Sequence, residues 1–384
     1  MIHPSLEWLP ERHLDTVSTL AHSDELIEQV GNLQYQYLSQ DAGVIGLKEV
    51  PGGIVTRTTV DYIAPIPKKI QLLVADAIGA LRAAVEHTLF AEVEFLNGAP
   101  LDGKAAISVE MPACLESRAF DLWVNNRNRP VSLQGGGELV RRIRGLQPFH
   151  RDTGPELHPL ARLASHSNHS KHRKPAITAV RLVTMIRDDE SPQSFNEVQI
   201  RDELPLQVGD VIAETPYGVR VPASLFPSIG INRPGTDEWP ILMRELDEIS
   251  SWVRTQAIPR LIAGDAQPQA ELPPRYDISV GHDDVREAIS LGSTVSANER
   301  IQIRMGAASA RESLVELLQF AQGEIDPKLV TGWLSSLTDE DVLERVARLK
   351  AAPTADGGAV QANMAVLHDL REEVLTSARD RAGS

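Results

Sequence analysis

Apolar residues at helical spacing predict most of the secondary structure of this chain. The strongest stripe runs through residues 68–96, where apolar side chains recur every three or four positions from Ile70 to Leu89 and Asn97-Gly98 marks the end. Residues 24–38 have similar spacing, and Ser23 or Asp24 can cap that helix. The same pattern predicts further helices at residues 138–145, 159–173 and 237–262.

Runs rich in Val, Ile and Thr, punctuated by Gly and Pro, predict strands. One run, residues 54–60, follows a glycine-rich break in the helical pattern. Residues 105–111 are also strand-like, whereas residues 115–125 are weakly helical. A small antiparallel sheet is predicted from four runs between the later helices, at residues 176–187, 197–200, 209–215 and 219–222.

The order of these elements predicts an α+β protein that is mainly α, a helical-bundle core with a small antiparallel β-sheet insertion and a C-terminal helical module. A chain of 384 residues is too long for one ordinary core. The Ala-, Gln-, Glu- and Pro-rich stretch at residues 265–274 is the predicted linker. The core would then cover residues 1–264, with the insertion at about 176–232, and the acidic module residues 275–384.

Four helices are expected in the acidic module, at residues 308–322, 327–337, 339–349 and 360–381. Thr338 and Asp341 have the spacing of a capping box at the start of the third. The module shows no repeat and no cluster of chemistry-bearing residues. Its expected role is therefore dimerisation or the docking of a protein partner.

The composition narrows the class of protein. Hydrophobic residues make up 42% of the chain and charged residues 24%, which is typical of a folded protein. No segment is apolar enough to span a bilayer and the start lacks a signal-peptide pattern, so a cytoplasmic protein without a membrane partner is expected. The net charge of −15 argues against indiscriminate nucleic-acid binding. The single cysteine, Cys114, excludes an internal disulfide and a Cys-Cys zinc site.

Positive charge and histidine are concentrated in one segment of this acidic chain. Residues 141–181 carry nine Lys/Arg and two Asp/Glu, a net charge of +7. Five of the 11 histidines lie within or beside them, at His150, His158, His166, His169 and His172. Histidine titrates near neutrality, donates and accepts hydrogen bonds and binds metals, so the segment is a candidate chemical site.

The spacing of these histidines argues against a metal site on one helix face. His166, His169 and His172 recur every three residues, which rotates them around a helix and prevents convergence on one ion. The His-Glu-x-x-His pattern is absent. A metal-dependent hydrolase with ligands from His150, His158 and Asp76 is therefore only the third hypothesis, and no cofactor is predicted.

Two helices are expected to meet at the site. On the 68–96 helix, Asp76 and His87 are eleven residues apart and so point within about 20° of each other, while Arg82 is placed to pair with Glu86 at i,i+4. On the 159–173 helix, Leu160, Leu163, Ala164 and Ser167 form the expected buried side. Asn168 and Lys171 would continue that side toward a cleft, whereas His166 and His169 are expected to be plain surface residues.

The leading hypothesis is a protein that binds RNA or cleaves it without metal, because a proton-transfer group and nearby cations suffice for attack by the 2′-hydroxyl. The predicted catalytic residues are Arg82, His87 and His172. The predicted substrate-binding residues are Asp76, Asn168, Lys171 and Arg173. The alternative is a non-enzymatic interaction protein whose His/Lys/Arg cluster is a buried polar network. A homodimer is also possible on either hypothesis.

Two blocks of the chain resemble an uncharacterised bacterial family. They are Asp76-x5-Arg82-x4-His87, and Gln147-Pro-Phe-His150 followed by Asn168-x2-Lys171-His172-Arg173. The resemblance covers about residues 20–262 and implies a shared fold layout and site position, but no activity. The chain departs from the family at Gly79-Ala80, where members carry His-Asn, at Glu86, which replaces Asp, and at Ser170, which also replaces Asp.

The pair Arg82-x4-His87 is also similar to the Arg-x4–6-His motif of HEPN-superfamily proteins, helical bundles that include ribonucleases. That similarity implies that Arg82 stabilises the transition state and that His87 acts as acid and base across a dimer cleft. The chain has Ala83 where HEPN motifs usually have a polar residue.

Overall fold

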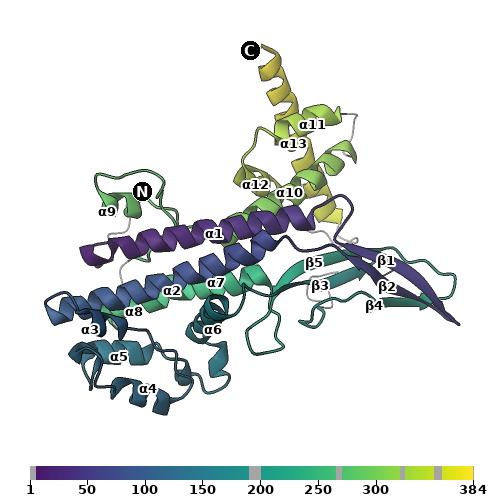
Figure 1. Cartoon of the computed structure of the whole chain (residues 1–384). Coiled ribbons are helices and arrows are strands. Elements are labelled where there is room, and N and C mark those ends of the chain that lie inside the picture. The colour runs from purple at the N-terminus through teal and green to yellow at the C-terminus, as the bar shows by residue number, and fades with distance from the viewer. Residues whose placement is uncertain (1–5, 190–199, 265–269, 321–324, 350–356, 384) are drawn as a thin grey trace. The chain divides into compact units, whose positions relative to one another are not determined.

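The computed structural model describes residues 6–189, 200–264, 270–320, 325–349 and 357–383 (Figure 1). The protein is α+β and mainly helical, as predicted. It divides into two compact units, the first ending at Asn298 and the second beginning at Glu299. Residues 275–298 belong to the first unit rather than to the predicted C-terminal module. The hydroxyl of Tyr276 lies 2.5 Å from that of Ser18, and Arg275 Nη1 donates to Glu28 at 2.6 Å.

The described helices and strands of the first unit follow one another in runs, with two strands after the first helix and three strands after the sixth. Its helices are α1 (Leu14–Leu38), α2 (Lys68–Asn97), α3 (Gly103–Ile107), α4 (Ser117–Val124), α5 (Glu138–Gly145), α6 (Pro159–His172), α7 (Leu242–Trp252), α8 (Ile258–Ala263) and α9 (Val285–Ser290). Its strands are β1 (Ile45–Gly52), β2 (Val55–Ile63), β3 (Thr178–Arg187), β4 (Val211–Pro216) and β5 (Ala223–Ile231). A π-helical turn, Val253–Ala257, joins α7 to α8.

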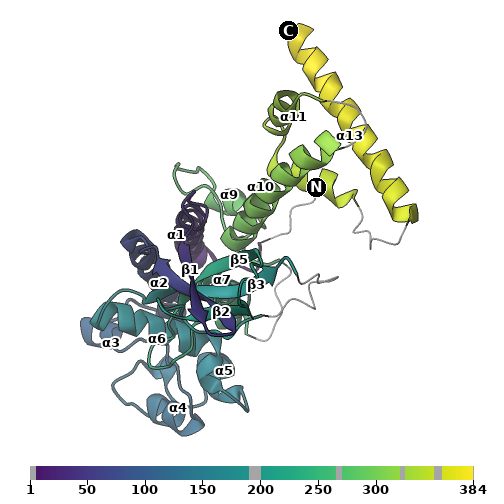
Figure 2. The ribbon, with the colours of Figure 1, turned by 90° about the vertical axis from the view of Figure 1, so that its right-hand side faces the viewer.

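The long helix α2 is the centre of this unit, lying between α1 and α6 in both views (Figures 1 and 2). Its predicted apolar stripe, which includes Ile70, Leu81 and Leu89, is fully buried. Gly98 ends the helix with a φ of 71°, a left-handed conformation that glycine adopts without strain. The periodicity of the sequence therefore located α2 correctly.

The start of α1 differs from the prediction. The helix begins at Leu14, nine or ten residues before the expected cap at Ser23 or Asp24. Asp24 lies inside the helix, is buried, and accepts a hydrogen bond from the backbone N–H of Ala297 at 2.8 Å. The Asp24 carboxylate thus accepts from a free N–H at the start of a later helix, which begins at Ala297. It caps that helix rather than its own.

The strands form two antiparallel sheets, of order β1-β2-β4 and β3-β5. The hairpin between β1 and β2 turns at Gly53 and Ile54, and Gly53 has a φ of 79°. Strand β1 was not predicted, because Gly46, Pro51 and Gly52 interrupt its apolar pattern. The sheet is accordingly not confined to the predicted insertion.

Two further strand predictions were wrong, and a third lies mostly outside the described residues. Residues 105–111 form no strand, because Asp102 caps the short helix α3 through the N–H of Ala105 at 2.7 Å. The run at 219–222 precedes β5 instead of forming a strand. Of the predicted run 197–200, residues 197–199 lie outside the described residues, and Ile200 is not in a strand.

The second unit consists of helices around its own core. They are α10 (Ala297–Phe320), which begins at the end of the first unit, α11 (Pro327–Leu334), α12 (Asp339–Ala347) and α13 (Gly357–Gly383). Leu314, Trp333 and Leu370 are among its buried residues. The capping box of Thr338 and Asp341 is confirmed at the start of α12.

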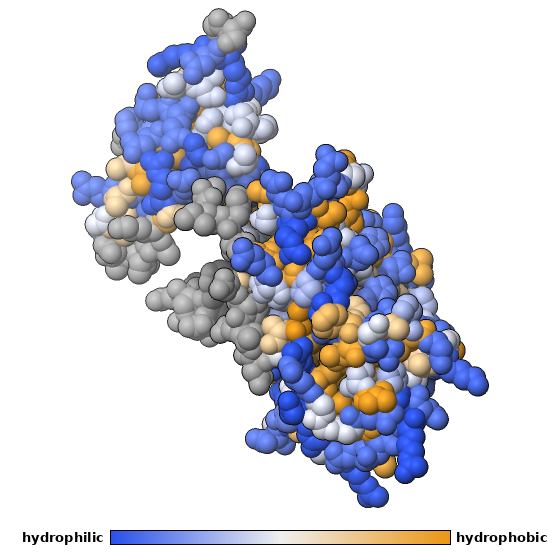
Figure 3. Space-filling view, turned by 90° about the vertical axis from the view of Figure 1, so that its left-hand side faces the viewer, coloured by the Kyte–Doolittle hydropathy of each residue, from blue (hydrophilic) through white to orange (hydrophobic). Residues whose placement is uncertain are grey.

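The surface mixes apolar and polar residues, and Figure 3 shows both kinds on the face that it views. Phe95 and Leu96, at the end of α2, are 61% and 54% exposed. Among the described helices, none combines the length and the apolar character that crossing a membrane requires.

Candidate functional site

Helix α6 carries most of the basic segment and begins at an unusual cap. The Nδ1 atom of His158 accepts a hydrogen bond from the backbone N–H of Leu160 at 3.1 Å, and Pro159 occupies the first helical position. The His158 ring also packs edge-on against Trp252. Burial, followed by the charges of Arg151 and Arg162, lowers the pKa of His158 to about 4. The ring is therefore neutral at pH 7, as an acceptor at a helix cap must be.

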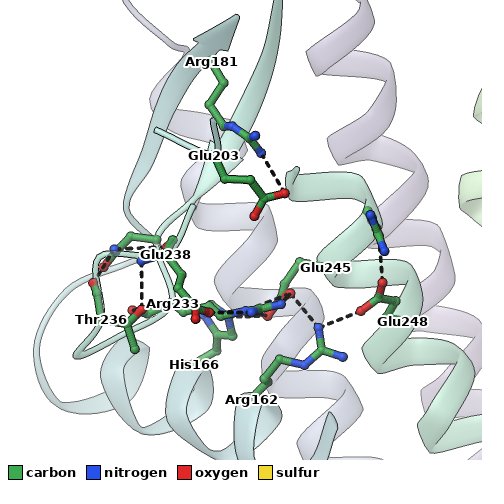
Figure 4. Close-up of polar contacts among 11 residues, drawn as sticks. Arg162, His166, Arg181, Glu203, Arg233, Thr236, Glu238, Glu245 and Glu248 are labelled. Atoms are coloured by element: carbon green, nitrogen blue, oxygen red, sulfur yellow. Dashed lines mark hydrogen bonds and ion pairs between the residues drawn. The ribbon is translucent and has the colours of Figure 1, made fainter. Parts of the chain in front are cut away.

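The buried face of α6 meets α7 through a carboxylate that is fully excluded from solvent. Glu245 is 0% exposed and accepts from Arg162 and Arg233, each at 2.7 Å (Figure 4). Arg162 also reaches Glu248 at 2.8 Å. His166 Nε2 lies 3.3 Å from Glu245. We call Arg162, His166, Arg233, Glu245 and Glu248 the Glu245 network.

The charge state of the Glu245 network follows from these contacts. Burial alone would raise the pKa of Glu245, but hydrogen bonds from His166 and Arg233 and the charges of both arginines lower it to about 2. Glu245 is thus ionised at neutral pH and balances two guanidinium groups in a site with little water. Such a buried group of charges is costly to disrupt.

The expectation that His166 and His169 are plain surface residues was wrong for His166, whereas His169 is half-buried. His166 is 6% exposed, and the Nε2 atom of His169 is buried without a hydrogen-bond partner among the described residues. Burial, followed by the charges of Arg173 and Lys174, lowers the pKa of His169 below its usual value. The helix is turned so that position 166 follows Leu163 on the buried side, where it can reach Glu245.

That same rotation exposes the residues expected to continue the buried side. Asn168 and Lys171 are both exposed, as are His172, Arg173 and Lys174. None of the five has a side-chain hydrogen bond or ion pair within the described chain. The helix dipole favours cations at a helix C-terminus, which is a structural reason for some of the positive side chains at the end of α6.

Two adjoining hollows lie along this side of α6. The outer hollow measures about 380 Å³ and contains no carboxylate in its lining, which is Ser165, Asn168, His169, His172, Arg173, Pro234 and Gly235. The inner hollow measures about 340 Å³ and shares Ser165, Asn168 and Pro234 with the outer one. It also borders the Glu245 network through Arg162, His166 and Arg233. We call the two hollows together the α6 groove.

The opposite wall of the α6 groove is a loop that its own hydrogen bonds hold in shape. Thr236 N donates to the Arg233 carbonyl at 3.1 Å, and Asn232 Nδ2 donates to the Thr236 carbonyl at 2.9 Å. Gly235 has a φ of 83°, which the turn requires. Ser165 of α6 donates across to the Pro234 carbonyl at 3.4 Å.

Arg82, a predicted catalytic residue, lies away from the α6 groove and has a structural role. It is 8% exposed, and its Nη2 donates to the Met111 carbonyl at 2.6 Å and pairs with Glu86 at 2.5 Å, as the i,i+4 spacing predicted. Glu86 in turn accepts from the Met111 N–H at 2.8 Å. Burial raises the pKa of Glu86 more than Arg82 and this N–H lower it. Arg82 and Glu86 together clamp the Met111 peptide.

The structure does not bring the predicted α2 residues to the α6 groove. Asp76 and His87 are exposed and have no side-chain partner among the described residues. The part of α2 that faces α6 is instead Val74, Ala75 and Ile78, which line a small cavity with His166 and His169. Of the seven predicted site residues, Asn168, His172 and Arg173 line the groove, and Lys171 lies beside it on the same helix end.

Replacing Arg82 should therefore affect stability and replacing His87 should not. Arg82→Ala removes the partner of both the Met111 carbonyl and Glu86, and we expect it to lower the free energy of unfolding by about 2–3 kcal/mol. His87→Ala should change it by less than about 0.5 kcal/mol. Urea unfolding of both variants measures this. A large loss in His87→Ala, or none in Arg82→Ala, would contradict the assignment.

Another buried carboxylate, which the sequence did not reveal, is that of Glu92 near the C-terminal end of α2. Glu92 accepts from His13 and from Arg12, each at 2.7 Å, and lies 3.8 Å from Arg142. Burial opposes ionisation of Glu92, but the hydrogen bonds from His13 and Arg12 lower its pKa below the usual value. It joins α2 to the chain before α1 and to α5, and it borders none of the hollows of the α6 groove.

Metal binding finds no support in the described residues, since no three His, Cys, Asp or Glu side chains gather there as ligands would. The proposed ligand set is also not assembled, because His158 caps α6, His150 bonds to the Arg144 carbonyl at 2.9 Å, and Asp76 is exposed on α2.

Comparison with known proteins gives no independent lead. No protein-family model, curated protein or solved structure matches the chain. The resemblances to an uncharacterised bacterial family and to HEPN-superfamily proteins therefore stay predictions from the quoted motifs.

Proposed function

We propose that the protein binds single-stranded RNA and that the α6 groove is its contact surface. The observation that carries the proposal is the outer hollow, which presents His169, His172 and Arg173 with no carboxylate in its lining. Phosphate groups bind where cations and hydrogen-bond donors converge without competing anions. Lys171 and Lys174 extend this positive surface along the end of the helix.

The groove also suits a single strand better than a duplex. Single-stranded RNA presents unstacked bases that enter concave sites, whereas an A-form duplex is recognised mainly by its backbone across a wide, shallow surface. A hollow of about 380 Å³ beside one of about 340 Å³ fits individual nucleotides. The local charge is opposite to that of the whole chain, so binding would be confined to this surface.

The second unit offers a contrasting surface. Its open groove, of about 870 Å³, is lined by Trp333, by the acids Asp369, Glu372, Glu373 and Asp380, and by a single cation, Arg381, among its charged side chains. Such a surface repels phosphates, and it leaves α6 as the better site for RNA. Docking of a protein partner by this unit stays a prediction.

Binding is better supported than cleavage. The proposed catalytic set of Arg82, His87 and His172 is not assembled, because only His172 lines the groove. We expect labelled RNA to remain intact when incubated with the protein in EDTA. Shortening of the RNA that is lost in His172→Ala would instead add a metal-independent cleavage step at the same groove.

Fluorescence anisotropy with a labelled single-stranded 12-mer tests the binding proposal. Affinity should fall as salt rises, and Arg173→Ala should weaken binding several-fold and reduce the slope of log K against log salt by about one. Arg220→Ala is the matched control, because Arg220 is 86% exposed but lies beyond β4, away from the groove. Absence of binding at low salt, or an equal effect of the two variants, would overturn the proposal.

A further inference from the structure

The inner hollow of the α6 groove differs in character from the outer one. Its lining includes aliphatic side chains from three parts of the chain, Ala113, Leu115, Leu157, Ala161, Ala164 and Pro234. At about 340 Å³ it is at the small end of the range of ligand-binding pockets. Burying the faces of a flat ring against such aliphatic side chains removes apolar surface from water, which is favourable.

Two polar groups at this hollow have unused hydrogen-bonding capacity. Arg162 is 5% exposed, and its Nε has no hydrogen-bond partner among the described residues. Glu238 binds Arg233 through Oε2 at 2.6 Å, and its Oε1 has no partner in the described chain (Figure 4). The Glu238 side chain is 48% exposed, so a ligand can reach it. Besides other polar residues of the lining, such as Glu156 and Asn168, the hollow thus offers an unpaired donor on Arg162 and an unpaired acceptor on Glu238.

These groups complement the edge of guanine. Guanine presents the O6 acceptor beside the N1–H and N2–H donors, so a guanidinium N–H can meet O6 while a carboxylate accepts from N1–H and N2–H. Adenine has no N1–H to donate. The two hollows share Ser165, Asn168 and Pro234, so a base in the inner one would have its phosphate beside the cations of the outer one.

We propose that the inner hollow is a guanine-binding pocket, and that the α6 groove binds one guanosine nucleotide with its base against Glu238 and Arg162 and its phosphate against His172 and Arg173. The proposal deepens the RNA-binding function and rests on it for the natural ligand. The pocket itself can be tested with a free nucleotide.

Isothermal titration of the full chain with guanosine 5′-monophosphate and adenosine 5′-monophosphate tests the pocket. Wild type should bind the guanosine nucleotide at least about tenfold more tightly, the discrimination expected from one paired base edge. Glu238→Ala should remove this preference, and Glu238→Gln should reduce it. Glu49→Ala should keep it. Glu49 is a suitable control because its carboxylate is 47% exposed and lies 3.5 Å from Arg220, outside the groove.

The outcomes separate the two proposals. If wild type binds neither nucleotide, or binds both equally, the guanine pocket is overturned even when the RNA 12-mer binds. If Glu238→Ala keeps its fold by circular dichroism and also keeps the preference, the pocket is likewise overturned. Tight binding of the guanosine nucleotide together with no binding of RNA would support the pocket and remove the RNA-binding function.

Discussion

Replacing Glu245 with alanine is expected to lower the free energy of unfolding by about 3–5 kcal/mol. The change leaves Arg162 buried beside only Glu248, removes the acceptor of His166, and leaves Arg233 with Glu238 as its carboxylate partner. Glu248→Ala is the matched control on the same helix. Because Glu248 is 39% exposed, its loss should cost no more than about 1 kcal/mol. Equal losses in the two variants, measured by urea unfolding, would contradict the central role of Glu245.

The stability that the Glu245 carboxylate contributes should depend on pH in a defined direction. The pKa of Glu245 is lowered from 4.5 to about 2 in the folded protein. A lowered carboxyl pKa contributes stability that is present above the unfolded value and lost as the pH falls through the folded value. The advantage of wild type over Glu245→Gln should therefore be constant above about pH 5 and shrink between pH 4.5 and 2. An advantage that grows on acidification would contradict this assignment.

Introducing two carboxylates into the outer hollow should have the largest effect on RNA binding. His172→Glu/Arg173→Glu places two carboxylates where phosphates are proposed to lie, and we expect the affinity for the 12-mer to fall by about 100-fold at low salt. Both residues are exposed and unpaired within the described chain, so the melting temperature should hardly change.

Arg118→Glu/Arg127→Glu is the control for this experiment. These two arginines are also exposed and have no ion pair among the described residues, but they lie on α4 and in the loop after it. The control changes the formal net charge by −4, one unit more than the −3 of His172→Glu/Arg173→Glu with histidine counted as neutral, so a smaller loss of affinity in the control cannot come from a smaller change in overall charge. A comparable loss of affinity in both double variants would mean that the RNA contacts no particular groove.

Much of the fold followed from local pattern. The stripe of α2, its glycine end and the capping box of α12 depend on residues a few positions apart, and each was predicted correctly. Strand β1 and helix α3 were missed because glycine, proline and an aspartate cap outweighed the apolar pattern there. The periodicity of apolar residues does not show which of several local and tertiary preferences will prevail in a segment.

The candidate site was predictable in place but not in detail. The excess of positive charge and histidine located α6, and Asn168, His172 and Arg173 do line one groove. The partner of His166 is Glu245, which lies 79 residues further along the chain. The sequence around His166 therefore could not predict that this side chain is buried. One signal was available, since Glu245 interrupts the apolar stripe of Leu242, Leu246 and Ile249, and an acid in that position has to be neutralised by cations.

Photo-crosslinking shows most directly whether RNA binds at the α6 groove. A single-stranded RNA containing 4-thiouridine would be bound to the full chain, irradiated and digested, and the modified peptides identified by mass spectrometry. We expect adducts within residues 165–174 and 233–238, and their loss in His172→Glu/Arg173→Glu. Adducts confined to the second unit or to the β1–β2 hairpin, or no adducts at all, would contradict it.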